Sequence, residues 1–194
     1  MNRALALAAA ACIGLTVVAC SSDEARTPTA HNTAGHTDER PANAPVVPNP
    51  VQGLDRFMQS PCRMVPKEEA SAIGFNEGLP ETDQDQGPAC EWRNDNGEHF
   101  AIVLLKNQPL GIAGLYRNHE QFDDFYKYFE PVDVAGYPGV FADGYDARPN
   151  SACTLGVGVT DQQIITVTTR VRSQDPCQVA KKAAEAAVTT MSAS

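Results

Sequence analysis

The sequence predicts an α+β fold: an antiparallel sheet of about five or six strands, helices packed mainly on one face, and two disulfides. Some segments alternate apolar and polar residues with the period of a half-buried strand, as in 99–106 and 153–159. Two others, 112–129 and 176–191, have the apolar spacing of amphipathic helices. Residues 54–194 are long enough for one hydrophobic core, so we expect a single domain there. A two-layer β-sandwich with peripheral helices is the alternative.

Residues 1–19 have the pattern of a lipoprotein signal peptide. A short positive segment containing Arg3 precedes an apolar run, 4–19, which is shorter than the about 20 residues that a membrane span needs. The run leads into Val-Val-Ala-Cys at 17–20, which resembles the lipobox of bacterial lipoproteins, where the cysteine receives a diacylglyceryl group before cleavage. We therefore expect lipidation of Cys20. An ordinary secretory signal with an incidental cysteine is the alternative.

The number of cysteines favours lipidation. The chain has six, and Cys12 leaves with the signal peptide. Without a lipid on Cys20, one of the remaining thiols would stay unpaired in an oxidising space. Lipidation leaves an even set that can pair fully: Cys62, Cys90, Cys153 and Cys177. Because two or three acyl chains hold stably in a bilayer, we expect the protein to be lipid-anchored and extracytoplasmic, on the outer face of the cytoplasmic membrane.

Residues 20–53 are expected to form the lipidated cysteine and a disordered tether rich in proline and threonine. The segment contains five prolines and no aromatic residue, so it buries too little apolar surface to offset the entropy lost on ordering. Such a tether lifts a folded domain off the membrane. We interpret His31 and His36 as solvated side chains, since a structural metal site needs several converging ligands.

Two helices are expected to begin at a proline followed by a cysteine. Residues 60–62 (Ser-Pro-Cys) and 175–177 (Asp-Pro-Cys) each offer a side-chain cap and a proline at the first helical position. The first helix restarts or continues through 66–70 and ends at Gly74. A cysteine at a helix N-terminus is a candidate reactive thiolate. In an exported chain with an even set of cysteines, we expect disulfide sulfurs instead.

The first pair of strands is expected around a hairpin turn. Cys90 and Trp92 alternate onto one face of a strand. The Asn-Asp-Asn-Gly sequence at 94–97 predicts the turn, and 99–106 is the returning strand.

The other strands are expected in the second half of the domain. Residues 153–159 place a cysteine and aliphatic side chains on one face, with Gly156 and Gly158 on the other, where another element can approach closely. Residues 164–171 are rich in β-branched residues. We expect one more strand at 133–142, kinked at its Gly-Tyr-Pro-Gly.

The helix expected at 112–129 has an aromatic face that includes Phe122, Phe125 and Phe129. We interpret these rings as core, although a ligand-lining role is the alternative. His119 lies on the same face and is interpreted as a partly buried imidazole and not as a catalyst.

Four cysteines permit three pairings, which sequence alone does not distinguish. We expect Cys62–Cys90 and Cys153–Cys177, because short separations along the chain collide most often. Each bridge would join a helix start to a neighbouring strand and contribute about 3–4 kcal/mol in the chain-entropy model.

The order of these motifs resembles one family over nearly the whole chain. A lipobox and a tether precede Ser-Pro-Cys at 60–62, a Glu-Glu-Ala helix, and Cys-x-Trp at 90–92; then come Glu-Pro-Val-Asp-Val-Ala-Gly-Tyr-Pro at 130–138, a cysteine strand, and Asp-Pro-Cys at 175–177. This is similar to the actinobacterial secreted lipoproteins that share the domain of unknown function 3558. Ser60 replaces the aspartate usual in that family. The resemblance implies an envelope-anchored domain without an assigned activity.

No motif selects a catalytic, metal-binding or cofactor-binding residue, and we expect none. The sequence lacks the nucleophile elbow, the zinc helix, the phosphate loop and the dinucleotide fingerprint. Residues 83–87 hint at a calcium loop, but their glycine is the fifth residue instead of the sixth, and the twelfth is Asn94 instead of glutamate. Asp143 and Asp146, the candidate paired carboxylates, lie in a turn.

Charge argues against nucleic acid as a partner. Removal of residues 1–19 leaves 14 basic and 24 acidic residues, a net charge of −10. Binding to phosphate backbones needs clustered lysine and arginine, which the sequence lacks.

Three functions are compatible with these features. The favoured one is a non-enzymatic surface lipoprotein that binds a protein, a wall component or another ligand in the cell envelope. The second is a carrier of a lipid or apolar small molecule, with a cavity lined by Phe122, Phe125 and Phe129. The third is an envelope hydrolase that uses His99 or His119.

Overall fold

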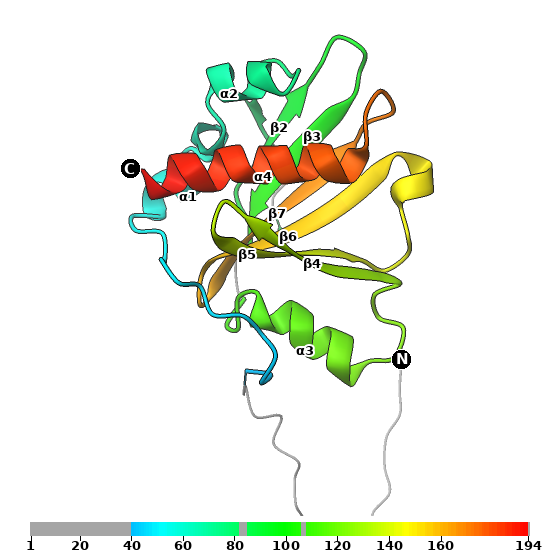
Figure 1. Ribbon diagram of the computed structural model, residues 1–194. Helices are drawn as coiled ribbons and strands as arrows, with labels where there is room; N and C mark the ends of the chain where they lie inside the picture. The colour runs from blue at the N-terminus through cyan, green and yellow to red at the C-terminus, as the bar shows by residue number, and fades with distance from the viewer. Residues whose placement is uncertain (1–39, 82–84, 106–107, 194) are drawn as a thin grey trace, which may run out of the picture. The chain divides into compact units, whose positions relative to one another are not determined.

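The computed structural model describes residues 40–81, 85–105 and 108–193, which form one antiparallel sheet flanked by helices (Figure 1). The sheet has seven strands in the order β1-β2-β3-β7-β6-β5-β4. The α+β class and the antiparallel sheet are confirmed, with slightly more strands than expected. The signal peptide, Cys20 and the tether as far as residue 39 lie outside the described residues.

The strands are β1 (Leu79–Pro80), β2 (Ala89–Arg93), β3 (His99–Leu104), β4 (Tyr128–Val134), β5 (Tyr137–Asp143), β6 (Ala152–Thr160) and β7 (Gln163–Arg170). The α-helices are α1 (Asp55–Gln59), α2 (Lys67–Ala72), α3 (Ala113–Gln121) and α4 (Pro176–Ser192). The short 3₁₀ helices are η1 (Pro61–Met64) and η2 (Arg148–Asn150). In the described part of the chain, no helix is both long and apolar enough to span a bilayer.

One face of the sheet carries the main core, and α4 lies across it (Figure 1). Leu155 of β6 and Val167 of β7 point to this face and are fully buried. The helix turns small side chains such as Ala183 and Ala187 toward the core, so it packs close to the strands. Because α1, η1 and α2 extend the same core, most helices pack on one face, as expected.

The opposite face holds α3, which lies against two glycines of β6 (Figure 1). A Cβ atom at Gly156 would lie 2.7 Å from Leu115 Cδ1, and one at Gly158 would lie 3.0 Å from Ile112 Cγ2. The expected close approach at these glycines is therefore confirmed: the element that approaches is α3 and the residues leading into it. A second, smaller core forms there, around Ile112 and Val140.

The hairpin expected at 94–97 is present between β2 and β3. Asn94 Oδ1 accepts hydrogen bonds from the backbone N–H groups of Asn96 and Glu98, both at 3.0 Å. Gly97 has a φ of +74°, which glycine adopts without strain.

The single strand expected at 133–142 is wrong, because this segment is part of a hairpin of β4 and β5. Ala135 and Gly136 form its turn with φ values of +51° and +85°. Asp133 Oδ1 accepts a hydrogen bond from the Gly136 N–H at 3.1 Å. Two successive residues with positive φ match the right-handed twist of a hairpin, so the chain reverses where a kink was expected.

The helix expected at 112–129 is also wrong in its second half, since α3 ends at Gln121. Phe122 is extended, Asp124 has a φ of +64°, and Phe129 belongs to β4. Within α3 itself only Ala113 and Tyr116 are buried, so the helix has little packing to extend it. Residues after Tyr128 instead pair with β5 along a full strand.

The folded domain begins before Leu54, which differs from the expected boundary. The compact unit that contains the described residues is Thr37–Ser194. In segment 40–53, Val47 and Val51 are 3% and 4% exposed and belong to the main core. The Val51 N–H donates a hydrogen bond to the Val159 carbonyl at 2.8 Å.

A polar contact holds the start of the same segment. Arg40 Nη2 lies 2.9 Å from Asp161 Oδ1, and Arg40 Nη1 donates to the Pro45 carbonyl at 2.6 Å. Segment 40–53 is thus part of the domain. The few aliphatic side chains in it suffice because they meet an existing core surface instead of each other.

Candidate functional site

The two disulfides form as expected, Cys62–Cys90 and Cys153–Cys177, with Cα–Cα distances of 5.0 Å and 5.2 Å. The first joins η1 to β2, and the second joins the start of α4 to β6. Both helix starts have proline at the first position, but their caps differ from each other.

Only the second helix start has the side-chain cap that both were expected to have. Asp175 Oδ1 accepts from the N–H groups of Cys177 and Gln178 at 2.8 Å and 3.0 Å. Ser60 makes no such bond, and Pro61–Met64 is a 3₁₀ helix instead of an α-helix. The cysteine bridge therefore holds the first helix start without help from the cap.

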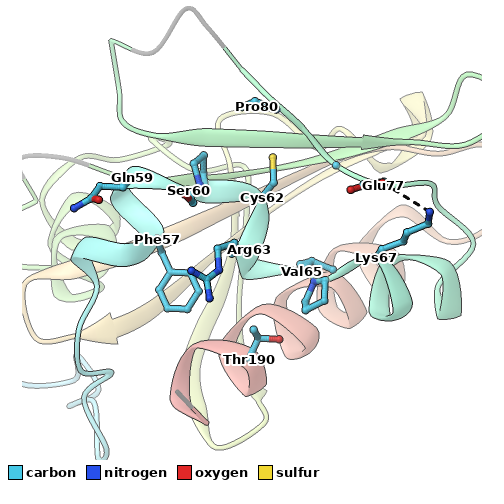
Figure 2. Close-up of a pocket in the computed structure, with 13 residues that line it drawn as sticks. Phe57, Gln59, Ser60, Cys62, Arg63, Val65, Lys67, Glu77, Pro80 and Thr190 are labelled. Atoms are coloured by element: carbon cyan, nitrogen blue, oxygen red, sulfur yellow. Dashed lines mark ion pairs between the residues drawn. The ribbon is translucent and has the colours of Figure 1, made fainter.

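A cleft of about 550 Å³ lies beside Cys62 (Figure 2). Three parts of the chain form it: α1 with η1 and the start of α2, the residues leading into β1, and the end of α4. The lining residues are Phe57, Gln59, Ser60, Pro61, Cys62, Arg63, Val65, Pro66, Lys67, Glu77, Gly78, Pro80 and Thr190.

The inner wall of the cleft is apolar. Phe57 and Val65 are 2% and 1% exposed, and Pro61 is also buried. Phe57 and Val65 belong to the main core and present their outer edges to the cleft. An apolar wall of this kind favours a ligand with an apolar body.

Two cations line the cleft and differ in their pairing. Lys67 Nζ lies 3.7 Å from Glu77 Oε2 (Figure 2), and both side chains are more than half exposed, so this pair contributes only about 0–1 kcal/mol. The Arg63 guanidinium makes no ion pair or hydrogen bond within the described residues, although the backbone N–H of Arg63 donates to the Ser60 carbonyl at 3.1 Å. The cleft thus holds one neutralised and one unpaired cation in an acidic protein.

Gly78 lines the cleft, and Trp92, the only tryptophan of the chain, lies behind it. A Cβ atom at Gly78 would lie 2.6 Å from both Cys90 Sγ and Trp92 Nε1, so only glycine lets the backbone pass this close. Trp92 is fully buried and stacks on Phe100 with ring centroids 4.8 Å apart. Its indole N–H has no hydrogen-bond partner within the described residues.

Neither candidate histidine lines the cleft. His99 Nε2 lies 3.9 Å from Glu91 Oε2, and both residues are on the sheet face turned away from the main core. His119 is exposed, so its interpretation as a partly buried imidazole is wrong; its ring stacks on Phe129, with centroids 4.0 Å apart. His31 and His36 lie outside the described residues.

The candidate paired carboxylates have separate structural partners. Asp143 Oδ2 accepts from the Thr154 N–H at 3.2 Å. Asp146 binds the Arg148 guanidinium through two hydrogen bonds of 2.7 Å, and these bonds hold the pKa of Asp146 below its ordinary value. The Arg148 guanidinium also lies over the Tyr128 ring at 3.9 Å.

The calcium loop hinted at in the sequence is only partly described, since 82–84 lie outside the described residues. Among residues 40–81, 85–105 and 108–193, no three histidine, cysteine, aspartate or glutamate side chains gather where they could hold a metal ion.

The interpretation of Phe122 and Phe125 as core residues is wrong, whereas Phe129 does pack against a core. Phe122 and Phe125 are 52% and 47% exposed, because they follow the end of α3 instead of continuing it. Phe129 packs into the small core beside Tyr116.

Sequence reasoning did not identify Arg63 or Gly78. Arg63 follows a cysteine and Gly78 precedes a two-residue strand, and neither lies in a recognisable motif. Their roles depend on how three distant segments come together, which no local pattern encodes.

These features define a class: an α+β domain held by two disulfides, with a cleft of mixed character beside one of them. The chain belongs to the family of proteins of unknown function DUF3558, whose model matches residues 15–190. No curated protein and no solved structure matches it.

Proposed function

We propose that the protein is a non-enzymatic lipoprotein of the cell envelope, lipidated at Cys20 and held on the outer face of the cytoplasmic membrane. Its domain binds a ligand or partner at the cleft beside Cys62. The pairing of the domain cysteines supports the anchor, since Cys62, Cys90, Cys153 and Cys177 pair with one another and none is left for Cys20. Disulfides persist in oxidising compartments, which supports export.

The anchor is tested by mass spectrometry of the protein from its native membrane. The N-terminal peptide is expected to begin at Cys20 with a diacylglyceryl group. A Cys20→Ala variant is expected to lose this modification, whereas a Ser21→Ala variant keeps it. An unmodified Cys20 in the wild type, or wild-type protein found entirely in the medium, would contradict the proposal.

The cleft carries the binding function. Its volume of about 550 Å³ lies within the range of about 300–1,000 Å³ usual for ligand sites. It combines buried apolar side chains with charged groups at its rim, the usual composition of a binding site.

Binding at the cleft is tested with a photo-crosslinking residue in intact cells. A crosslinker at Gln59, which lines the cleft and is exposed, is expected to capture a defined envelope component. The matched control is Thr168, which is exposed on β7 away from the cleft. Equal products from the two positions would count against the cleft as the binding site.

A carrier of an apolar small molecule remains the second candidate, and the apolar wall formed by Phe57 and Val65 favours it. A carrier retains its cargo, so native mass spectrometry of the purified protein would show a bound small molecule. The envelope hydrolase has no comparable support, because His99 and His119 lie apart from the cleft.

A further inference from the structure

We propose that the ligand of the cleft is an amphiphilic monocarboxylate, with its carboxylate on Arg63 and its apolar body along Phe57 and Val65. This inference rests on the proposed function, which makes the cleft the binding site, and it names the class of ligand.

The head group follows from the unpaired guanidinium. Arg63 lines the cleft, and its side chain has no ion pair or hydrogen bond within the described residues. The planar guanidinium matches a carboxylate with two parallel hydrogen bonds, and such charge-assisted bonds are stronger than neutral ones. An unpaired arginine in a chain with a net charge of −9 is a local site of opposite charge.

The number of negative charges on the ligand is inferred from the Lys67–Glu77 ion pair at the rim of the cleft. Glu77 Oε2 lies 3.7 Å from Lys67 Nζ, so the charge of Lys67 is offset by an adjacent carboxylate (Figure 2). Only Arg63 is left among the cleft cations to hold an anion. A second anionic group would lack a free cation and would meet Glu77, so a ligand with a single negative charge fits best.

The apolar body of the ligand is inferred from the apolar residues that line the cleft. Figure 2 shows Arg63, Phe57 and Thr190 around the same cleft. Phe57 and Val65 are almost fully buried yet line the cleft, and Pro66 and Pro80 add accessible apolar surface. A hydrocarbon or aromatic body that covers the exposed Pro80 and the half-buried Pro66 removes apolar surface from water on both partners, and the edges of Phe57 and Val65 add dispersion contacts.

Trp92 provides a signal for binding. It is the only tryptophan of the chain, and it lies directly behind Gly78, which lines the cleft. A ligand that presses on residues 77–80 changes the surroundings of the indole and therefore its fluorescence.

The test titrates octanoate against the full-length protein in phosphatidylcholine vesicles, with Trp92 fluorescence and equilibrium dialysis of labelled octanoate as two readouts. Empty vesicles correct for partitioning into lipid. Wild type is expected to bind saturably. Arg63→Gln is expected to bind about tenfold or more weakly, because a charge-assisted contact is lost, and Arg63→Lys is expected to recover part of the affinity. Arg170→Gln, an exposed arginine at the end of β7, is the matched control and should bind like wild type.

Octanol and octylammonium test whether binding requires the carboxylate or only an apolar chain. Both are expected to bind at least about tenfold more weakly than octanoate. Octanol binding as tightly as octanoate would overturn the carboxylate but leave the cleft as an apolar-ligand site. Octanoate binding that Arg63→Gln leaves unchanged would overturn the proposal. If no probe binds while a crosslinker at Gln59 still captures an envelope component, the proposed ligand class is wrong. If crosslinkers at Gln59 and Thr168 also give the same products, the proposed function is wrong too.

Discussion

Glu98 is the residue on which the hydrogen bonds of two distant loops converge. It accepts from Asn94 Nδ2 in the β2–β3 turn at 2.9 Å. It also accepts from the N–H groups of Arg172 and Ser173 at 2.8 Å and 2.7 Å, and from Ser173 Oγ at 2.7 Å. These bonds, with the one from Asn94 contributing most, lower the pKa of Glu98 from 4.5 to about 2. The carboxylate therefore joins the turn to the segment that leads into α4.

The low pKa of Glu98 predicts a loss of stability in acid. A group whose pKa is lower in the folded state stabilises the fold above its unfolded pKa, and this contribution disappears as pH falls through the folded value. Wild type is expected to lose stability between pH 4.5 and about 2, the two pKa values of Glu98. Glu98→Gln should be less stable at pH 7 and have a flatter profile across that window, as measured by urea unfolding. Glu120→Gln, an exposed glutamate, is the control, and an identical profile for Glu98→Gln and wild type would refute this role.

Single residues were predictable where the signal was local. Asp175 caps α4 because its side chain needs only the next two N–H groups. Ser60 offered the same pattern, yet its backbone is not placed to cap, and η1 is held by the Cys62–Cys90 bridge instead. Arg63 could not be recognised, because its importance depends on having no partner in a cleft made by three segments.

Among the elements, α3 depends most on a pair of glycines. Its residues and Ile112 before it sit where side chains at Gly156 and Gly158 would otherwise be. Because glycine has no side chain, the surface of β6 is recessed at these two positions, and α3 packs into the recess.

Gly158→Val is predicted to displace this helix. The new methyl groups would compete for space with Ile112 Cγ2 and Val47 Cγ2, which lie 3.0 Å and 3.1 Å from an added Cβ. Overpacking of this kind costs typically about 1–3 kcal/mol. Gly114→Ala on α3 is the control: its Cβ would meet only Leu110 Cβ at an ordinary 3.8 Å, so stability should stay the same or rise. Chemical denaturation measures the stability of both variants. Equal stability of Gly158→Val and wild type would contradict the close packing of α3 on these glycines.

The errors at the scale of helices and strands have two causes. Phe122, Phe125 and Phe129 recur at a helical spacing, but this period does not show which surface is available to bury them. β4 instead takes up Phe129, because β5 supplies a full set of backbone partners. The β4–β5 turn at Ala135 and Gly136 was missed because alanine rarely adopts a positive φ.

At the scale of the whole molecule, segment 40–53 completes the packing of the domain. Val51 pairs with the Val159 backbone, and Val47 reaches the space above Gly158. Arg40 and Asp161 fasten the start of the segment to the β6–β7 turn.

Two neighbouring valines test this extension of the domain. Val47 is 3% exposed and Val46 is 63% exposed. Val47→Ala is predicted to lower the free energy of unfolding by about 1–2 kcal/mol, because it removes buried methyl groups. Val46→Ala should change it by no more than about 0.5 kcal/mol. Thermal or urea unfolding compares them, and similar small effects at both positions would show that the segment adds little to the fold.

The sequence by itself determined the α+β class, the β2–β3 hairpin and the cap of α4, and it favoured the disulfide pairing that forms, because period, turn chemistry, cap chemistry and short chain separations act over a few residues to a few tens of residues. Only the tertiary structure decided the start of the domain, the length of α3, the β4–β5 hairpin and the cleft beside Cys62. The hydrophobic effect is non-directional, so it does not specify which apolar side chains contact each other. Those contacts depend on which surfaces come together in the complete tertiary structure.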